Sequence, residues 1–338
     1  MMLRTTFAGA AAGIALIAGA QAATAEAHIE RLTVAYFLEW PMPFQFSKEN
    51  GVYDERLGIP VDWVAFDTGT AMSAAMASGD VQIAVSQGVP PFVVATSQGQ
   101  DLQAIDVAVS YSDNDNCVVR SDLEIDKTNA GDLAGMTAAV PLGTAAHYGF
   151  LRQMDHFGVD VSTMQVVDMA PAEGAVAIGQ GDVDIACGYG AGLTRMTEFG
   201  NVLLTGAEKE EIGIPVFDVT SAPADFVAEN ADLVAQFLAV TAEANAMWNE
   251  GSMQEEMIGV IAQDAGMTQD ATRDFMATFT FPSIEQQLSE TWFGGNTEEF
   301  MKGVAGVFVE AGSIPSALDS YAQAVNVGPL ETAQSMSQ

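Results

Sequence analysis

Three segments place hydroxyl groups and small residues where a predicted strand leads into a predicted helix. They are Asp67-Thr68-Gly69-Thr70, Ser86-Gln87-Gly88 and Gly143-Thr144-Ala145-Ala146-His147. The first amides of a helix have no intrahelical partner and lie at the positive end of the helix dipole, so they favour anions. Any one of these segments can be a plain N-cap. Three of them together predict an anionic group bound at the strand ends, with Ser86 and Thr144 as hydroxyl donors.

Acidic and aromatic residues offer the opposite chemistry. Phe37, Glu39 and Trp40 lie at the end of the first predicted strand, and Asp218 lies inside the β-rich run 216–220. Carboxylates and aromatic faces bind ammonium groups. A carboxylate in an apolar run is unusual unless it faces a cleft or a structural partner. An anion site opposite such an acid predicts a site for a zwitterion.

Two further segments carry less specific signals. His147 and Tyr148 begin a predicted helix, where a core or capping role is as reasonable as ligand contact. Gly188-Tyr189-Gly190 follows a strand but lacks the spacing of a dinucleotide loop, so we interpret it as a glycine-rich cleft wall that presents Tyr189. The complete set of candidate ligand-binding residues is Phe37, Glu39, Trp40, Ser86, Gln87, Thr144, Ala145, His147, Tyr148, Tyr189 and Asp218.

Signals for catalysis or metal binding are weak. The sequence has no Gly-x-Ser-x-Gly nucleophile elbow and no His-Glu-x-x-His zinc motif. Its three histidines and two cysteines stand at no ligand spacing, so we expect neither a metal nor a cofactor. Cys117 and Cys187 could form a disulfide in an oxidising compartment, although two buried thiols are the more ordinary interpretation.

The elements that must position these residues come from an internal duplication. Residues 66–84 align without gaps with residues 168–186, and both segments predict a strand, a helix of small residues, a Gly-Asp turn and a buried strand. Gly79 and Gly181 supply the left-handed backbone that ends each helix. Two βαβ units predict two α/β lobes, each with a parallel sheet, and a ligand cleft between them.

The order of strands along the chain gives the lobe boundaries. The polar run 111–116 is the best candidate for a crossover between lobes, and the strand near Asp218 returns to the first lobe. Helices over 231–249, 253–265, 270–278 and 297–311 are expected to pack on the first lobe. We therefore assign 28–112 and 219–338 to lobe one and 113–218 to lobe two.

The N-terminal residues and the charge indicate the compartment. Arg4, the apolar run 8–20 and Ala20-Gln21-Ala22 predict a signal peptide over 1–27, cleaved near Ala22 to Ala27. Forty-five acidic residues against 11 basic ones give a formal charge of −34, which disfavours nucleic acid and anionic lipid as partners. We expect an exported protein in the periplasm.

Several segments resemble the nitrate, sulfonate and taurine binding family, the periplasmic solute-binding proteins of ABC transporters. The similar segments are residues 61–95, 139–148, 181–186 and 214–219. The resemblance implies a type II periplasmic binding protein that closes around a small solute and delivers it to a permease in the inner membrane. It implies that Ser86, Thr144 and neighbouring amides hold the sulfonate of taurine or a close aminosulfonate, that Asp218 holds the amine, and that the protein is a monomer.

Two alternatives remain open at the level of the sequence. The aromatic residues Trp40, Phe37, Phe44 and Tyr189 could form a cage for a betaine or a sulfonium zwitterion. An enzyme related to pyrimidine-synthesising proteins of the same fold would act through a lysine and a histidine. The export signal and the lack of any lysine between Lys48 and Lys127 argue against such an enzyme.

Overall fold

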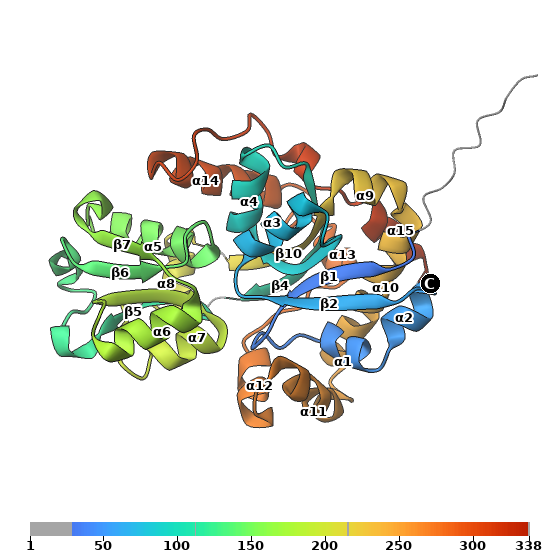
Figure 1. Cartoon of the computed structure of the whole chain (residues 1–338), viewed down its shortest axis with the longest axis horizontal. Helices are drawn as coiled ribbons and strands as arrows, with labels where there is room; N and C mark the ends of the chain where they lie inside the picture. The colour runs from blue at the N-terminus through green and yellow to red at the C-terminus, as the bar shows by residue number, and fades with distance from the viewer. Residues whose placement is uncertain (1–28, 112, 215, 337–338) are drawn as a thin grey trace, which may run out of the picture.

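Two five-stranded sheets, each packed with helices, form two lobes that lie side by side (Figure 1). The computed structural model describes residues 29–111, 113–214 and 216–336. The segment assigned to the signal peptide lies outside the described residues. The two α/β lobes expected from the sequence are confirmed.

The sheet of lobe one has the strand order β2-β1-β3-β10-β4. β1 pairs with β2 and β3 in parallel, whereas β10 runs antiparallel to both β3 and β4. The bounds of these strands are β1 Leu32–Phe37, β2 Val61–Phe66, β3 Ile83–Gly88, β4 Leu102–Tyr111 and β10 Val216–Pro223.

The sheet of lobe two repeats this arrangement with the order β7-β6-β8-β5-β9. β6 pairs with β7 and β8 in parallel, and β5 runs antiparallel to β8 and β9. The bounds are β5 Asp115–Arg120, β6 Thr137–Val140, β7 Gln165–Asp168, β8 Ile185–Tyr189 and β9 Gly200–Val202.

The prediction of purely parallel sheets is wrong at one strand of each lobe. β5 is the first strand after the chain passes from lobe one to lobe two, and β10 is the first after it returns. Neither strand is therefore joined by a helix to a preceding strand of its own sheet. A crossover of that kind is what makes successive strands parallel. Asp218 lies within β10, and so in the sheet of lobe one, although the sequence-based boundary places it at the end of lobe two.

The helices of lobe one come from both ends of the chain. They are α1 Phe44–Glu49, α2 Val52–Leu57, α3 Gly69–Ser78, α4 Val89–Ser97, α9 Ala224–Glu229, α10 Ala231–Glu250, α11 Gln254–Ala265, α12 Gln269–Met276, α13 Ile284–Gln287, α14 Asn296–Glu310 and α15 Gly328–Met336. α14 packs on α4 and also reaches α5 of lobe two. The segment after Leu330, which has the composition of a polar tail, instead belongs to α15 and packs on α10 with Leu330 and Ala333 buried.

Lobe two has four α-helices among its described residues: α5 Ala145–His156, α6 Pro171–Gln180, α7 Gly190–Met196 and α8 Gly206–Glu211. The duplicated helices α3 and α6 both end at glycines in the left-handed conformation, Gly79 at φ 83° and Gly181 at φ 79°. The duplicated βαβ units are therefore confirmed. α7 was not predicted, because its glycine-rich start has low helix propensity.

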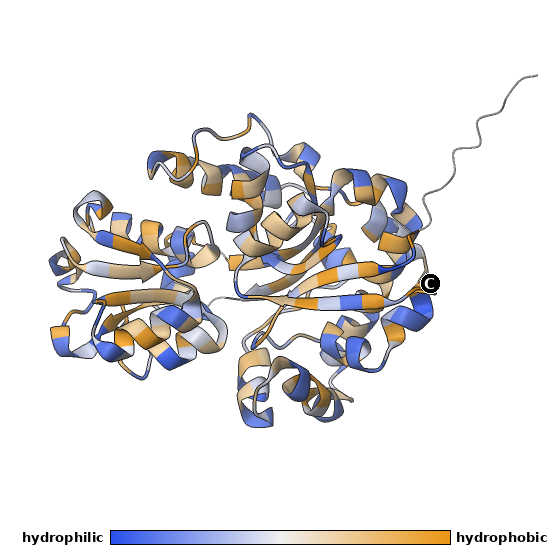
Figure 2. Cartoon of the chain, viewed as in Figure 1, coloured by the Kyte–Doolittle hydropathy of each residue, from blue (hydrophilic) through white to orange (hydrophobic). Residues whose placement is uncertain are grey.

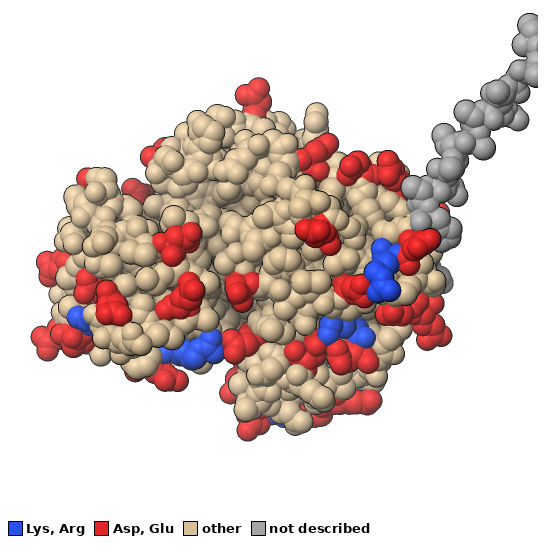
Figure 3. Space-filling view, in the orientation of Figure 1, with Lys and Arg blue, Asp and Glu red and all other residues tan. Residues whose placement is uncertain are grey.

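Apolar side chains follow the strands of both sheets and the inner faces of the helices, as the hydropathy colouring shows (Figure 2). The visible surface carries acidic side chains on both lobes and few basic ones (Figure 3). Within the described part of the chain, no helix combines the length and apolar content needed to span a membrane.

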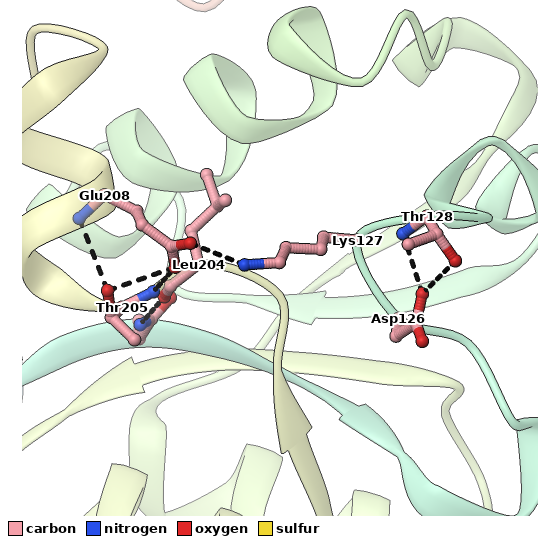
Figure 4. A network of polar contacts seen from close by, with 7 residues as sticks. Asp126, Lys127, Thr128, Leu204, Thr205 and Glu208 are labelled. Atoms are coloured by element: carbon pink, nitrogen blue, oxygen red, sulfur yellow. Dashed lines mark hydrogen bonds and ion pairs between the residues drawn. The ribbon is translucent and has the colours of Figure 1, made fainter.

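A disulfide and a group of hydrogen bonds stabilise lobe two locally. Cys117 and Cys187 are direct cross-strand partners in β5 and β8 and form a disulfide, so the interpretation as two buried thiols is wrong. At the start of α8, Glu208 accepts hydrogen bonds from the Thr205 amide and from Lys127 Nζ (Figure 4). The hydrogen bond from Lys127 lowers the pKa of Glu208 to about 2.

Candidate functional site

A pocket opens between the lobes, with about 300 Å³ of space between atoms, open solvent included, and we call it the inner pocket. It lies where β1, β3 and β8 end, which is the ligand edge of an open α/β sheet. Lobe one contributes Phe37, Trp40, Gly69, Gly88, Pro91, Tyr111 and Asp218, and lobe two contributes Thr144, Ala145 and Tyr189.

Asp218 is the acidic group of the inner pocket. Its side chain is buried, and its two carboxylate oxygens accept hydrogen bonds from Ser86 Oγ at 2.6 Å and from the Tyr111 hydroxyl at 2.9 Å. Burial raises the pKa of Asp218 to about 7, although both hydrogen bonds act in the opposite direction. A ligand ammonium that replaces water beside this carboxyl group would favour its ionised form.

Ser86 links Asp218 to Trp40. Trp40 Nε1 donates to Ser86 Oγ at 3.0 Å, and the Ser86 hydroxyl donates in turn to Asp218 Oδ2. The Ser86 backbone has φ 60°, a left-handed conformation that is uncommon for serine. Because its hydroxyl proton is committed to Asp218, Ser86 orients the acid in this structure and does not point a donor at an anion.

The Trp40 ring is held by other aromatic side chains. Its centroid lies 4.9 Å from those of Tyr111 and Phe279 and 5.6 Å from that of Phe275. Edge-on and tilted contacts of this kind fix an indole in place. One side of the inner pocket is therefore a rigid aromatic surface beside a carboxyl group.

The opposite side is the N-terminus of α5. Thr144 caps this helix, accepting from the His147 amide at 3.4 Å and donating to the Pro141 carbonyl at 2.6 Å. The Thr144 hydroxyl is thus engaged within lobe two, as that of Ser86 is within lobe one. What α5 offers an anion is the amide end of a twelve-residue helix, at Ala145.

Five of the candidate residues are not among those that line the inner pocket: Glu39, Ser86, Gln87, His147 and Tyr148. Gln87 lies inside lobe one and donates to Gly69 O at 2.9 Å and to Ser73 Oγ at 2.6 Å. His147, two residues after Ala145, projects from the opposite side of α5, because successive helix residues are rotated by about 100°.

His147 and Tyr148 contact aromatic side chains of α14. The His147 ring stacks on Phe308 with centroids 5.3 Å apart, and Tyr148 meets Phe300 and Phe308 edge-on. His147 Nδ1 accepts from the Gly143 amide at 3.1 Å, and burial lowers the pKa of this imidazole to about 4. Both side chains anchor α5 against α14.

Glu39 lies outside the inner pocket, in a neighbouring outer pocket of about 610 Å³ that also opens between the lobes. There it forms a two-pronged ion pair with Arg195 of α7, with both N–O distances 3.1 Å. Beside it, the Tyr189 hydroxyl donates to the Asp67 carbonyl of lobe one at 2.9 Å. These contacts join the two lobes directly.

Sequence reasoning missed one polar residue of the inner pocket, Tyr111, and a buried acid close to Asp218, Asp115. Tyr111 ends β4 and was assigned to the crossover, although an aromatic residue at a strand end was a usable signal. Asp115 begins β5 opposite Tyr189, and only 2% of it is exposed. Its Oδ2 has no hydrogen-bond partner among the described residues, and burial raises the pKa of its carboxyl group to about 7. In the sequence Asp115 lies in a polar run with Asp113, Asn114 and Asn116, so nothing marks it as a buried residue.

The comparisons with known proteins agree with this architecture. The Taurine-binding periplasmic protein of Escherichia coli (strain K12) is 26% identical over 304 residues, covering 89% of this chain and 92% of that protein. The periplasmic aliphatic sulphonate binding protein SsuA from Escherichia coli has a TM-score of 0.67 at 21% identity, covering 86% of this chain and 90% of that one.

A third relative is the alkanesulfonate-binding protein SsuA from Xanthomonas axonopodis pv. citri bound to MOPS, with a TM-score of 0.73 at 18% identity, covering 88% of this chain and 99% of that one. These structures confirm the type II periplasmic binding fold expected from the sequence. The family model described as NMT1/THI5 like matches residues 42–273. That match covers more than half of the chain, which therefore belongs to the NMT1/THI5-like family.

Proposed function

We propose that this protein is the periplasmic solute-binding component of an ABC importer and that it binds taurine or a close aminosulfonate. The observation that carries the proposal is the inner pocket itself, with the buried Asp218 carboxyl on lobe one and the N-terminus of α5 on lobe two. A short zwitterion with an ammonium and a sulfonate group matches both ends. The names of the relatives support the same class of solute.

Closure of the lobes would serve both recognition and release. Asp218 and Ala145 belong to different lobes, so they act on one small ligand only when the cleft is shut. Exclusion of water strengthens the attraction between the ammonium and the carboxylate. In this proposal the closed, loaded protein is the form that an inner-membrane permease recognises, and it acts as a monomer.

A second candidate is a betaine-like zwitterion. Phe37, Trp40, Tyr111 and Tyr189 line the inner pocket, and such rings favour a quaternary ammonium. Phe44, the fourth aromatic residue of the cage expected from the sequence, stacks on Trp63 with centroids 5.3 Å apart and is not among the residues that line this pocket. A primary ammonium can in addition donate hydrogen bonds to Asp218, which a quaternary one cannot, so we favour taurine.

The enzyme alternative has less support. Neither a lysine nor a histidine is among the described residues that line the inner pocket. Lys48 pairs with Asp264 and Glu49 instead, and His147 packs on Phe308. In our proposal the ligand leaves the protein chemically unchanged.

Calorimetry with taurine, hypotaurine, glycine betaine and choline tests the proposal. Taurine should bind most tightly, and ligand recovered from the complex should give an unaltered NMR spectrum. A betaine that binds more than about tenfold tighter, roughly 1.4 kcal/mol, would replace taurine by the aromatic-cage ligand. Light scattering of the ligand-bound protein measures its molar mass and so tests whether it is a monomer.

A further inference from the structure

The inner and outer pockets are separated by three aromatic side chains. Phe37, Trp40 and Tyr189 line both pockets, so they form the partition between them. Both lobes contribute to it, since Phe37 ends β1 and Tyr189 ends β8. We refer to these three side chains as the aromatic wall.

Contacts across the cleft hold the aromatic wall in place. The rings of Phe37 and Tyr189 have centroids 5.9 Å apart, and that of Tyr189 lies 6.4 Å from Trp40. The hydrogen bond from the Tyr189 hydroxyl to Asp67 fixes the far end of the tyrosine ring. A Cβ atom at Gly190, whose φ is 62°, would lie 3.3 Å from the Glu39 carbonyl and 3.5 Å from the Trp40 ring. The lobes therefore meet closely at this point, with little room for a ligand chain to pass.

The outer pocket, on the other side of the aromatic wall, could hold a substituent of a longer ligand. The outer pocket is the larger of the two, with about 610 Å³ of space between atoms against about 300 Å³, open solvent included in both. Much of its lining is small or apolar, from Leu38, Phe66, Ala170, Pro171, Ala172 and Ala191. Its charged members are Glu39 and Arg195, which pair with each other, and the acids Asp67 and Glu173. An alkyl or ring substituent would fit this lining if it could reach it.

We propose that the aromatic wall sets the maximum ligand size, and that Tyr189 is its specificity-determining residue. The wall confines the ligand to the inner pocket and excludes aminosulfonates that carry a bulky substituent, because their extra atoms would overlap the Phe37 and Tyr189 rings. Trp40 is buried and bonded to Ser86, whereas Phe37 and Tyr189 are only partly buried, so these two are the replaceable parts. This inference rests on the proposed function, whose ligand class it narrows.

Taurine and N-cyclohexyltaurine form a suitable pair of test ligands, since they share the aminoethanesulfonate group and differ only in a ring on the nitrogen. Calorimetry should show that the wild-type protein binds taurine at least about tenfold more tightly than N-cyclohexyltaurine, and that Tyr189→Ala reduces this ratio by about tenfold or more. Phe37→Ala removes the other half of the wall from lobe one and should act in the same direction. Phe37→Ala therefore provides a second measurement of the affinity ratio if Tyr189→Ala folds poorly.

Two control variants separate the wall from other effects. Tyr189→Phe loses the bond to Asp67 but keeps the ring, so it should preserve most of the discrimination. Arg195→Gln breaks the ion pair with Glu39 without opening the wall, so it should weaken both ligands by a similar factor.

The outcomes distinguish the two proposals. If the wild-type protein fails to bind taurine, the proposed function is wrong and this inference fails with it. If it binds taurine but binds N-cyclohexyltaurine equally well, or if both alanine variants leave the ratio unchanged, only the role of the aromatic wall is overturned.

Discussion

Glu39 and Arg195 face each other across the cleft, and each terminal guanidinium nitrogen lies 3.1 Å from one carboxylate oxygen. Glu39 follows β1 in lobe one with a left-handed backbone at φ 54°, and Arg195 belongs to α7 in lobe two. About 40% of each side chain remains exposed, so solvent screening limits the pair to roughly 0–1 kcal/mol. The pair orients the lobes in the closed form but does not lock them.

Glu39→Gln should therefore weaken taurine binding only slightly, by less than about fivefold, and the effect should shrink as salt is added. Calorimetry at low and high ionic strength measures both quantities. The matched control is Glu243→Gln, because Glu243 forms a similarly exposed pair with Arg56 entirely within lobe one. Equal losses in the two variants would contradict a role in closure.

Asp218→Asn should reduce the affinity for taurine by about 2 to 4 kcal/mol, since a buried ammonium would lose its counter-charge. The fold should persist, because asparagine can keep hydrogen bonds to Ser86 and Tyr111. Asp106→Asn is the control: Asp106 is a buried acid of the same sheet that accepts from Thr220 at 2.9 Å and does not line the inner pocket. Asp106→Asn should change the melting temperature and not the affinity. If Asp218→Asn also lowers the melting temperature and leaves the affinity unchanged, Asp218 has a structural role instead.

The affinity should also depend on pH through Asp218, whose pKa burial raises to about 7 in the ligand-free protein. Ammonium binding requires the ionised carboxylate, so below pH 7 the ligand must displace a proton. The affinity should fall by up to about tenfold per pH unit between pH 7 and pH 5. Asp218→Asn should flatten this profile, whereas a flat profile in the wild-type protein would mean that the ligand does not engage this acid.

The same shift has the opposite sign for the stability of the ligand-free protein. The folded state holds a proton on Asp218 more tightly than the unfolded chain does, because the pKa rises from 3.8 to about 7. The stabilisation that this proton contributes is complete below pH 3.8 and is lost as the pH rises to about 7. Denaturant unfolding of wild type and Asp218→Asn between pH 5 and pH 8 measures the contribution as the difference between their slopes.

The left-handed backbone of Ser86 permits a test with two substitutions. Ser86→Ala and Ser86→Gly both remove the hydroxyl between Trp40 and Asp218, so both should weaken ligand binding to a similar extent. Only glycine accepts φ 60° without strain, so the alanine variant should be less stable than the glycine variant by about 1 kcal/mol. Thermal unfolding of both proteins checks this, and equal stabilities would show that position 86 relaxes.

The disulfide should stabilise lobe two from within. Cys117 and Cys187 are 70 residues apart, and closing a loop of that size lowers the entropy of the unfolded chain by an amount worth about 4 kcal/mol. Replacing both cysteines by alanine should lower the urea midpoint, and a reductant should do the same to the wild-type protein only. Unchanged unfolding under reducing conditions would contradict this contribution.

The parts of the fold that could be predicted are those with local signals. The two βαβ units followed from helix-ending glycines and β-rich runs, and Asp218 stood out as a carboxylate in an apolar strand. The placement of β10 between β3 and β4 could not be predicted, because it depends on pairing between distant segments. For the same reason no local pattern indicates that Tyr111 contacts Asp218, 107 residues away, or that Glu39 contacts Arg195, 156 residues away. Side chains such as His147 sit at the right position in the chain but on the wrong face of their helix.

The strand order also constrains how the two sheets can form when the chain becomes available from its N-terminus onward. All five strands of lobe two lie within residues 115–202, so that lobe can complete its sheet as one continuous stretch. In lobe one the neighbour of β4 is β10, which arrives only after lobe two has been delivered. Lobe one therefore cannot complete its sheet until lobe two has been delivered, and β3 and β4 have to be kept from wrong pairings until residue 216 appears.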